Sequence, residues 1–556
     1  MSGFVFYEEK VEPAVTHRDL YEYYQLSRPG ENLIADAKTR QKLHKYLLGP
    51  EEDVDAIRAR SIVMYLHVSP VVRPGETVPQ ALYRAALETT AEETTGTWDP
   101  DLKTIEPGAM NADSERNMGA LQGRVIGINP RTGVVACALP VEGFEPGSLP
   151  QLSSVIIGNY TGMTSQSNAV RLEDVEVPVE YAETFPGPAL GPEGIWDKLG
   201  LPHGTPLMGT IVKPKTGLSP ADWAKTADLA YRGGLDVVKD DENLTDQAYC
   251  RFHERARLVL ENLRRLERDT GRKAVYVANV TAGTIDQMLE RAQFVVDNGG
   301  TCLMIDLLAA GWTALQTLRQ RFPDVIIHGH RAGHGTMTHM PRVEVGGRVR
   351  TIRHGISMKV LALFARLGGV DQLHVGAPLG KMDPENHAAL ENLEMITRPM
   401  GKIKPCLAIN SGGLSPDKFP EVVKQMAPPG EGKNLALVYQ AGGGTHAHPL
   451  GTFGGAKAMV QVRQAVQDDL SVVEALSRYY ELRLAYRRWR TSVYEEWVKS
   501  LTSSSRVVVD LDRRVHAIGK FVKGEPPRPV PIAEALKRDE ELRGDCERLN
   551  PGLSSG

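Results

Sequence analysis

The chain has 556 residues, of which 41% are hydrophobic and 24% charged, and Lys+Arg 65 against Asp+Glu 69 leaves a formal net charge of −4. These values are ordinary for a globular protein of two or more domains, and the balance of charge gives no reason to expect nucleic acid or a membrane surface as a partner. The five cysteines never occur as C-x-x-C, which disfavours a disulfide framework and a cysteine zinc site. The N-terminus has no signal-peptide pattern and the chain has no apolar run of membrane length, so we expect a cytoplasmic protein.

The first third of the chain predicts a small domain of strands and helices after a polar extension. Residues 1–60 form this extension, with short helical patterns in LYEYYQL and RQKLHKYLL. From Ser61, SIVMYLHVSP predicts a strand and VPQALYRAALETTAEE a helix. The β-rich runs GRVIGINP, GVVACALP and LSSVIIGN follow, each bounded by turn residues. We therefore expect an α+β domain over residues 61–190.

From about Leu207, short apolar runs that end in polar clusters alternate with stretches of helical period. Alternating strands and helices imply parallel strands, since a parallel connection needs a crossover. The eight runs predict a (β/α)8 barrel over residues 191–470. They are MGTIVKPK, DVVKDDE, AVYVANVT, CLMIDLL, VIIHGHR, DQLHVGA, PCLAINSGG and LALVYQAGGG.

Two segments lie outside this alternation. VEVGGRVRT, after the fifth run, predicts a small hairpin on the rim of the barrel. Residues 471–556 form a tail that is helical at first and then polar and proline-rich (GEPPRPVP), and we expect its end to be partly disordered.

Chemistry-bearing side chains follow six of the eight predicted strands. The active sites of such barrels lie at the C-terminal ends of the strands, so these side chains should meet at one mouth. In chain order they are Lys213 and Lys215, then Lys239, Asp241 and Glu242, then His330 and Arg331, then His374 and Lys381, then Ser411, Gly412 and Gly413, and finally Gly442 and Gly443.

The acids and glycines predict different ligands. Asp241 and Glu242 are hard oxygen ligands of the kind Mg²⁺ takes, although an isolated acidic run is more commonly a solvated loop. The turns SGG and AGGG follow neighbouring strands, where backbone N–H groups commonly bind phosphate, although ordinary glycine turns would look alike. Basic side chains on the other side of the mouth could hold a second anion. The pattern indicates a small bisphosphate with a metal between its ends.

The lysines and histidines leave alternatives open. Lys213 and Lys215 alternate, so one can face the site, where a desolvated lysine acts as acid or base. A triad of His328, His330 and His334 resembles a zinc site, but only the first two share a strand face. Lys239 is a poor neighbour for a cation as an ammonium. As a neutral amine that adds CO₂ it would become a carbamate and a third oxygen ligand.

These motifs together resemble the large subunit of ribulose-1,5-bisphosphate carboxylase/oxygenase (RuBisCO). The resemblance rests on GTIVKPKTGL, GGLDVVKDDENL, HGHRAGHG, DQLHVG, LGKM, SGGL and GGGTHAHP, with EETTGTW and IGNYTGM in the N-terminal part. KDDENL, HGISM and DQLHVG look like form III, whereas HRAGHG and GNYTGM look like form II or intermediate II/III sequences. The resemblance implies a ferredoxin-like sheet in the N-terminal domain and a TIM barrel after it.

The resemblance also implies residue roles. Lys239 would be carbamylated (N6-carboxylysine) and bind Mg²⁺ with Asp241 and Glu242. Lys213, supported by Lys215, and His330 would transfer protons, and Lys381 would stabilise the carboxylated intermediate with Glu92. The remaining substrate contacts would come from Arg331, His374 and Ser411 at one phosphate, from Thr97, Trp98, Gly412, Gly413, Gly442 and Gly443 at the other, and from Asn159 near the added CO₂.

The implied activity is carboxylation of ribulose-1,5-bisphosphate through an enediolate, with O₂ able to enter the same step. Glu92, Thr97, Trp98 and Asn159 would come from a neighbouring subunit, which implies a homodimer or an assembly of dimers; a small subunit is not evident. The loop GAPLGKMDPEN departs from the family at Ala377 and at Asp383-Pro384. The alternatives are a RuBisCO-like enolase or isomerase acting on a related phosphorylated sugar or thio-sugar, and a non-catalytic protein that keeps the fold.

Overall fold

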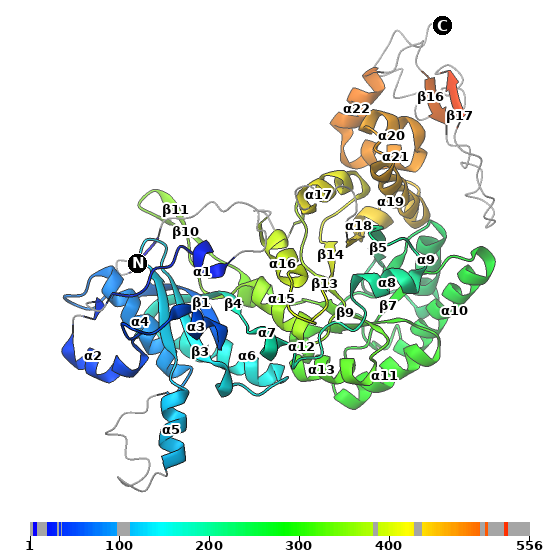
Figure 1. The fold of residues 1–556 in the computed structure, drawn as a ribbon. Coiled ribbons are helices and arrows are strands. Elements are labelled where there is room, and N and C mark those ends of the chain that lie inside the picture. The colour runs from blue at the N-terminus through cyan, green and yellow to red at the C-terminus, as the bar shows by residue number, and fades with distance from the viewer. Residues whose placement is uncertain are drawn as a thin grey trace.

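The computed structural model describes residues 4–7, 19–30, 33–34, 36–96, 112–381, 387–427 and 436–500, together with two short strands at 506–509 and 528–531. Figure 1 shows an N-terminal domain in blue and cyan beside a barrel in green and yellow, with the C-terminal helices in orange against the barrel. No helix in the described part of the chain is long and apolar enough to cross a membrane.

The N-terminal domain is a ferredoxin-like βαββαβ unit, as predicted. Its sheet has the order β12-β4-β1-β3-β2, with β1 antiparallel to both β3 and β4. The short β12 comes from beyond the fifth barrel strand and pairs in parallel with β4, so the barrel segment contributes an edge to this sheet. The elements are β1 (Ser61–Pro70), α4 (Val78–Glu92), α5 (Ala112–Ala120), β2 (Arg124–Asn129), β3 (Val134–Pro140), α6 (Leu149–Ile157), β4 (Ser167–Glu176), α7 (Val179–Ala182) and β12 (Gly355–Ile356).

One predicted strand of this domain is wrong. LSSVIIGN lies largely in α6, a helix with Ser148 at its N-cap and Pro150 in its first turn. Its buried side chains include Leu149, Leu152 and Ile156, and this spacing places them on one helical face. The β-branched run at the end of the helix has the composition of a strand, but burial of this apolar face against the rest of the domain stabilises the helix instead.

Two helices of the extension before Ser61 cover one face of the sheet, whereas Leu43 and Tyr46 of the same extension pack in the cluster on the other face. Its helices are α1 (Leu20–Tyr23), α2 (Ala37–Leu43) and α3 (Val54–Ala59). Leu20 of α1 and Ile57 of α3 form a buried cluster with Val63, Tyr65 and Ile126 of the sheet. Since α4 and α6 belong to a separate cluster, the sheet is covered on both faces, and the extension is part of the domain core.

The barrel is closed, with the strand order β13-β14-β15-β5-β6-β7-β8-β9, and each of the eight predicted runs supplies one strand. The strands are β5 (Leu207–Ile211), β6 (Val237–Lys239), β7 (Val275–Asn279), β8 (Cys302–Asp306), β9 (Ile326–His330), β13 (Gln372–His374), β14 (Leu407–Ser411) and β15 (Leu437–Gln440). The surrounding helices are α9 (Pro220–Arg232), α10 (Phe252–Thr270), α11 (Ile285–Asp297), α12 (Leu307–Ala310), α13 (Trp312–Arg321), α14 (Gly335–Thr338), α15 (Met358–Leu367), α16 (His387–Thr397), α17 (Phe419–Met426), α18 (Gly443–His446) and α19 (Gly451–Gln467).

The barrel interior is packed, and helix α8 (Gly191–Leu199) joins its packing at the end where the strands begin. Ile195 and Trp196 of this helix belong to the same buried cluster as Leu207, Ile326 and Leu407, which lie at or near the starts of three strands. The opposite, C-terminal end of the strands therefore remains as the mouth in which a site can form.

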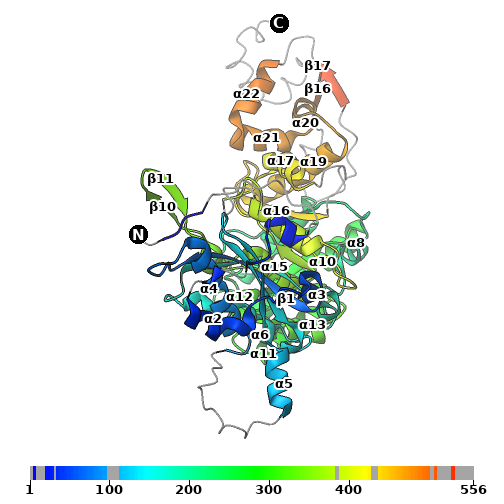
Figure 2. The ribbon, with the colours of Figure 1, turned by 60° about the vertical axis from the view of Figure 1, so that its left-hand side comes forward.

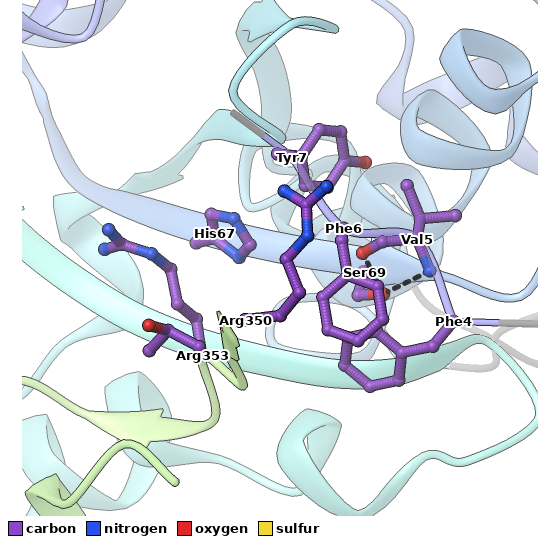
Figure 3. Close-up of a pocket in the computed structure, with 9 residues that line it drawn as sticks. Phe4, Val5, Phe6, Tyr7, His67, Ser69, Arg350 and Arg353 are labelled. Carbon is purple, nitrogen blue, oxygen red and sulfur yellow. Dashed lines mark hydrogen bonds between the residues drawn. The ribbon is translucent and has the colours of Figure 1, made fainter. Parts of the chain in front are cut away.

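The predicted hairpin is present as β10 (Arg342–Val345) and β11 (Arg348–Thr351), but it does not lie on the barrel rim. Both views place it beside the N-terminal domain. Figure 2 shows it next to the N-terminal segment, and Figure 3 shows Arg350 near Phe6 and Tyr7. Together with His67 these residues line a cavity of about 20 Å³. The hairpin lies just before β12 in the chain, and β12 pairs with β4 of the N-terminal sheet. Local turn chemistry cannot indicate such a tertiary pairing.

The C-terminal helices α20 (Val472–Arg478), α21 (Tyr480–Trp489) and α22 (Thr491–Ser500) pack on the barrel through α19. Lys457 of α19 forms an ion pair of 3.0 Å with buried Glu481, and Arg490 lies 3.4 Å from Asp417 beyond β14. Farther on, β16 (Arg506–Val509) pairs with β17 (Arg528–Pro531), so the proline-rich run contains a strand that was not predicted. The predicted disorder of the last residues lies outside the described part.

Candidate active site

Lys213 and Asp241 meet at the barrel mouth. Strand β5 ends at Ile211, so Lys213 and Lys215 lie in the bend beyond it rather than alternating on a strand. The Lys213 ammonium donates to Asp241 Oδ2, whereas Lys215 is exposed. Although burial raises the pKa of Asp241, the contact with Lys213 holds it below its usual value. Asp241 is therefore an ionised carboxylate oriented toward a cation.

Lys239 ends β6 and is 1% exposed. Its Nζ donates to the carbonyl oxygen of Asp240 at 2.7 Å and lies 3.9 Å from Glu242 Oε2. Burial lowers the pKa of this amine, against the neighbouring acids, which raise it. The neutral amine is the form that can add CO₂. The position of Nζ beside Glu242 and near Asp241 suits a third oxygen ligand for the same metal.

His330 ends β9 and faces the same acids. Its Nε2 lies 3.6 Å from Glu242 Oε2, and its Nδ1 lies 3.2 Å from Oδ1 of Asp306 at the end of β8. Burial and the charge of Lys239 lower its pKa. Nδ1 also accepts from the Ala332 N–H at 3.2 Å. A neutral imidazole beside two carboxylates can accept and return a proton, which suits a proton-transfer group.

His374 ends β13, and its side chain contacts Ser411 at the end of β14. Its Nδ1 lies 2.8 Å from Ser411 Oγ, and its Nε2 lies 2.9 Å from His328 Nε2. Burial keeps the pKa of both histidines well below the usual range. His334 instead contacts Thr338 Oγ1, at 2.9 Å. No group of three or more His, Cys, Asp or Glu side chains among the described residues is arranged as metal ligands, so the three-histidine zinc interpretation is wrong there.

The two glycine turns lie together beside a cavity of about 390 Å³. Gly413, Gly442 and Gly443 line it, with Trp489 at the end of α21. A Cβ at Gly442 would stand 3.2 Å from Lys213 Cε, so this turn lies against the lysine. Backbone amides at such turns and an adjacent ammonium are suited to a phosphate group.

Lys381 is attached to the first of these two glycine turns, the one after β14. Its backbone N–H donates to the Gly412 carbonyl at 3.0 Å, and its side chain is exposed. Lys418 strengthens the attachment by donating to the carbonyls of Gly413 at 2.7 Å and Leu379 at 3.4 Å. Ala377 is buried in this loop, whereas Asp383 and Pro384 lie outside the described residues.

The remaining predicted residues are dispersed. Arg331 lies against the loop after β13, since a Cβ at Gly376 would stand 2.9 Å from its Nη2. Glu92 and Asn159 lie in the N-terminal domain and, among the described residues, make no hydrogen bond or ion pair with the mouth. Thr97 and Trp98 lie outside the described residues. A single chain thus brings together the metal and phosphate candidates but not the whole predicted set.

Four residues at or near the mouth were missed. Asp306 contacts His330, and Asn279 Nδ2 donates to Asp306 Oδ2 at 3.4 Å. Both end predicted strands, so the rule that selected the other residues would have found them. Lys418 and Trp489 come from segments beyond the strand ends, and no local signal marks them.

Comparison with known proteins identifies the family. The N-terminal domain model of the ribulose bisphosphate carboxylase large chain matches residues 60–181, and its catalytic domain model matches residues 193–489. The chain belongs to this family. A ribulose bisphosphate carboxylase of Archaeoglobus fulgidus is 34% identical over 423 residues, which cover 73% of this chain and 90% of the relative. One of Methanosarcina barkeri is 38% identical over 371 residues, which cover 64% of this chain and 82% of the relative.

Solved structures agree. An octameric Rubisco from Pyrococcus horikoshii superposes with a TM-score of 0.70 at 32% identity, covering 81% of this chain and 97% of that one. A dimeric archaeal Rubisco from Hyperthermus butylicus gives 0.68 at 33% identity, covering 80% and 99%. The relatives and structures named here are archaeal, which agrees with the part of the resemblance that pointed to form III.

Proposed function

We propose that the chain is a ribulose-bisphosphate carboxylase that converts ribulose-1,5-bisphosphate and CO₂ into two molecules of 3-phosphoglycerate, with O₂ as a competing reactant. The observation that carries the proposal is the buried Lys239 amine, 3.9 Å from Glu242 and beside Asp241, at a mouth that also holds the two glycine turns. The family and its carboxylase relatives support the same activity.

The donor set fits Mg²⁺. Asp241 and Glu242 supply carboxylate oxygens, which Mg²⁺ prefers, and Asp241 already accepts from a cation, the Lys213 ammonium. Lys239, once carbamylated, would supply the third oxygen. When bound, the metal stabilises the negative charge that develops on the substrate oxygens during enolisation and carboxylation.

The side chains around these ligands bind the substrate ends. Ser411 and His374, which contact each other, and Arg331 would hold one phosphate. The backbone of Gly412, Gly413, Gly442 and Gly443 would hold the other. A five-carbon bisphosphate bound at both ends would lie across Lys239 with its reacting carbons fixed, which removes much of the entropic cost of reaction.

The proton transfers follow from the contacts. The carbamate on Lys239 would take the proton that is removed to form the enediolate. His330, which lies beside Asp306, would exchange protons with the sugar hydroxyls. Lys213 would return a proton to the product, supported by Lys215, and Lys381 would stabilise the carboxylated intermediate.

The proposed assembly is built from dimers. We infer that Glu92, Thr97, Trp98 and Asn159 reach the mouth of a neighbouring subunit. This would explain why Glu92 and Asn159 make no hydrogen bond or ion pair with the mouth in the described part of their own chain. The similar P. horikoshii and H. butylicus proteins are octameric and dimeric.

The test is incubation with Mg²⁺, labelled bicarbonate and ribulose-1,5-bisphosphate. We expect labelled 3-phosphoglycerate from the natural chain and from Lys225→Met, which changes an exposed lysine of α9, and none from Lys239→Met. If the natural chain makes no labelled product above the Lys239→Met background, the carboxylase proposal fails. Conversion of the bisphosphate without label would instead support the enolase or isomerase alternative.

A further inference from the structure

Glu93 is the second residue of the EETTGTW motif, but the proposed mechanism gives it no role; it holds the turn that carries Asn159. It lies directly after α4, and its Oε1 accepts from the backbone N–H of Asn159 at 3.1 Å. The N–H of Tyr160, at the start of the 3₁₀ turn η4 (Tyr160–Gly162), also bonds to this carboxylate.

The carboxylate occupies space that only a glycine leaves open. A Cβ at Gly158 would stand 2.1 Å from Glu93 Oε1 and 2.4 Å from Oε2. Gly158 also has φ 49°, in the left-handed region. Helix α6, Gly158 and Asn159 are consecutive, so the bonds to Glu93 tie the end of one helix to the end of another. These hydrogen bonds therefore fix the position of the Asn159 backbone and the direction in which its side chain starts.

The charge of Glu93 is poorly compensated. Burial, together with the charge of Glu92, raises its pKa to about 7, and the two backbone N–H bonds limit that rise. Of the charged groups in the described part of the chain, Glu92 is the one that perturbs Glu93. The titratable group facing it from η4 is Tyr160, whose phenol donates to the Ile156 carbonyl. No cation among these groups keeps the carboxylate ionised below neutrality.

We propose that Glu93 is a positioning residue for the carboxylation reaction, and that its ionised carboxylate holds the Gly158–Asn159 turn in the geometry in which Asn159 meets the substrate of the neighbouring subunit. This inference rests on the proposed function. An ionised acceptor makes stronger hydrogen bonds to backbone N–H groups than a neutral one. Protonation near pH 7 therefore loosens the turn without removing Glu93 from its place.

Glu93→Gln is the test variant, because glutamine keeps the shape and removes the charge. Glu142→Gln is the matched control, because Glu142 is exposed in the same domain. The first measurement is peptide-level hydrogen exchange of residues 155–163 at matched pH. We expect faster exchange in Glu93→Gln than in the natural chain above about pH 7, and convergence of the two below it. Equal exchange at every pH would overturn the proposal.

The second measurement is carboxylation against pH. Above about pH 7, kcat should fall about 10-fold in Glu93→Gln, the effect of losing one charge-assisted hydrogen bond. The ratio of the two kcat values should approach one as Glu93 of the natural chain is protonated. Taking the ratio cancels the pH dependence of Lys239 and His330, which both proteins share. A ratio that does not change with pH would contradict the role of the charge.

The two proposals fail separately. If the natural chain shows no carboxylation but the exchange of residues 155–163 responds to Glu93→Gln, the proposed function is wrong and Glu93 still holds the turn. If carboxylation is present and neither the exchange nor the kcat ratio responds, the proposed function stands and the role of Glu93 is wrong.

Discussion

Replacing Arg255 with methionine should destabilise the barrel beneath the candidate metal ligands. Arg255 of α10 and Asp240 are both fully buried, and the guanidinium contacts Asp240 Oδ2 through Nε at 3.3 Å and Nη2 at 3.2 Å. Asp240 stands between Lys239 and Asp241 in the chain. Methionine keeps much of the volume but removes the charge, so Asp240 would be left buried without a cation.

The structure sets the expected size of the effect. Without Arg255, the donors to Asp240 that remain in the described part of the chain are the Tyr276 hydroxyl at 2.8 Å and the Asn279 N–H at 3.1 Å. The carbonyls of Cys250 and Thr245, which now accept from Arg255, would also lose a donor. Breaking a buried ion pair at one partner costs about 3–5 kcal/mol. At roughly 2–4 °C per kcal/mol, the melting temperature should fall by about 6–20 °C.

Thermal unfolding of matched variants tests this reasoning. Tyr276→Phe removes one donor to the same carboxylate and should cost less, about 1.5–3 kcal/mol. The double variant Arg255→Met/Asp240→Asn removes both charges and should recover more than half of the loss, since the two sites are in contact. If Arg255→Met unfolds within about 1 kcal/mol of the natural chain, or if the double variant is the less stable of the two, the buried pair does not act as described.

Two further predictions concern regions away from the ligands. Trp489→Ala should raise KM for the bisphosphate at least about threefold with a smaller change in kcat, because one wall of the cavity beside the glycine turns is lost. Trp489→Phe should keep most of the affinity. An unchanged KM in Trp489→Ala would refute a role for this wall. Burial, reinforced by Arg353, lowers the pKa of His67 to about 4 from 6.5, so the unfolded chain binds a proton more readily and stability should fall as pH drops from about 6.5 toward 4. His67→Gln should make this fall in melting temperature shallower, and identical curves would refute it.

The barrel could be predicted from sequence because each strand has a short apolar run that ends in a polar residue or a glycine. A short, nearly continuous apolar run is typical of a strand that is buried on both faces of a parallel sheet. This signal can be found in each run by itself. The helix α6 and the position of the hairpin could not be predicted in the same way. In both cases a tertiary partner, the N-terminal sheet, decides between structures that the local composition allows equally.

The residues around the mouth likewise fall into those that the local sequence pattern indicates and those that only tertiary packing brings there. Lys239, Asp241, His330 and Ser411 end strands or follow them, so fold and spacing together bring them to one place. The contacts of Lys418 with the Gly413 turn, and of Trp489 with the cavity, depend on how later helices dock. The same is true of the contact of Glu93 with the Asn159 N–H, which lies 66 residues farther along the chain.

The three consecutive acids after β6 show how backbone geometry distributes chemistry. Successive side chains of an extended segment point to opposite faces, so Lys239 and Asp241 face the mouth while Asp240 faces the helices. The contacts agree, because Asp241 accepts from Lys213 and Asp240 from Arg255. The outward acid, bonded to α10 and β7, anchors the segment on which the inward groups stand. Asp240, the first of the three acids, is therefore better understood as a support for the segment that carries Asp241 and Glu242 than as a metal ligand itself.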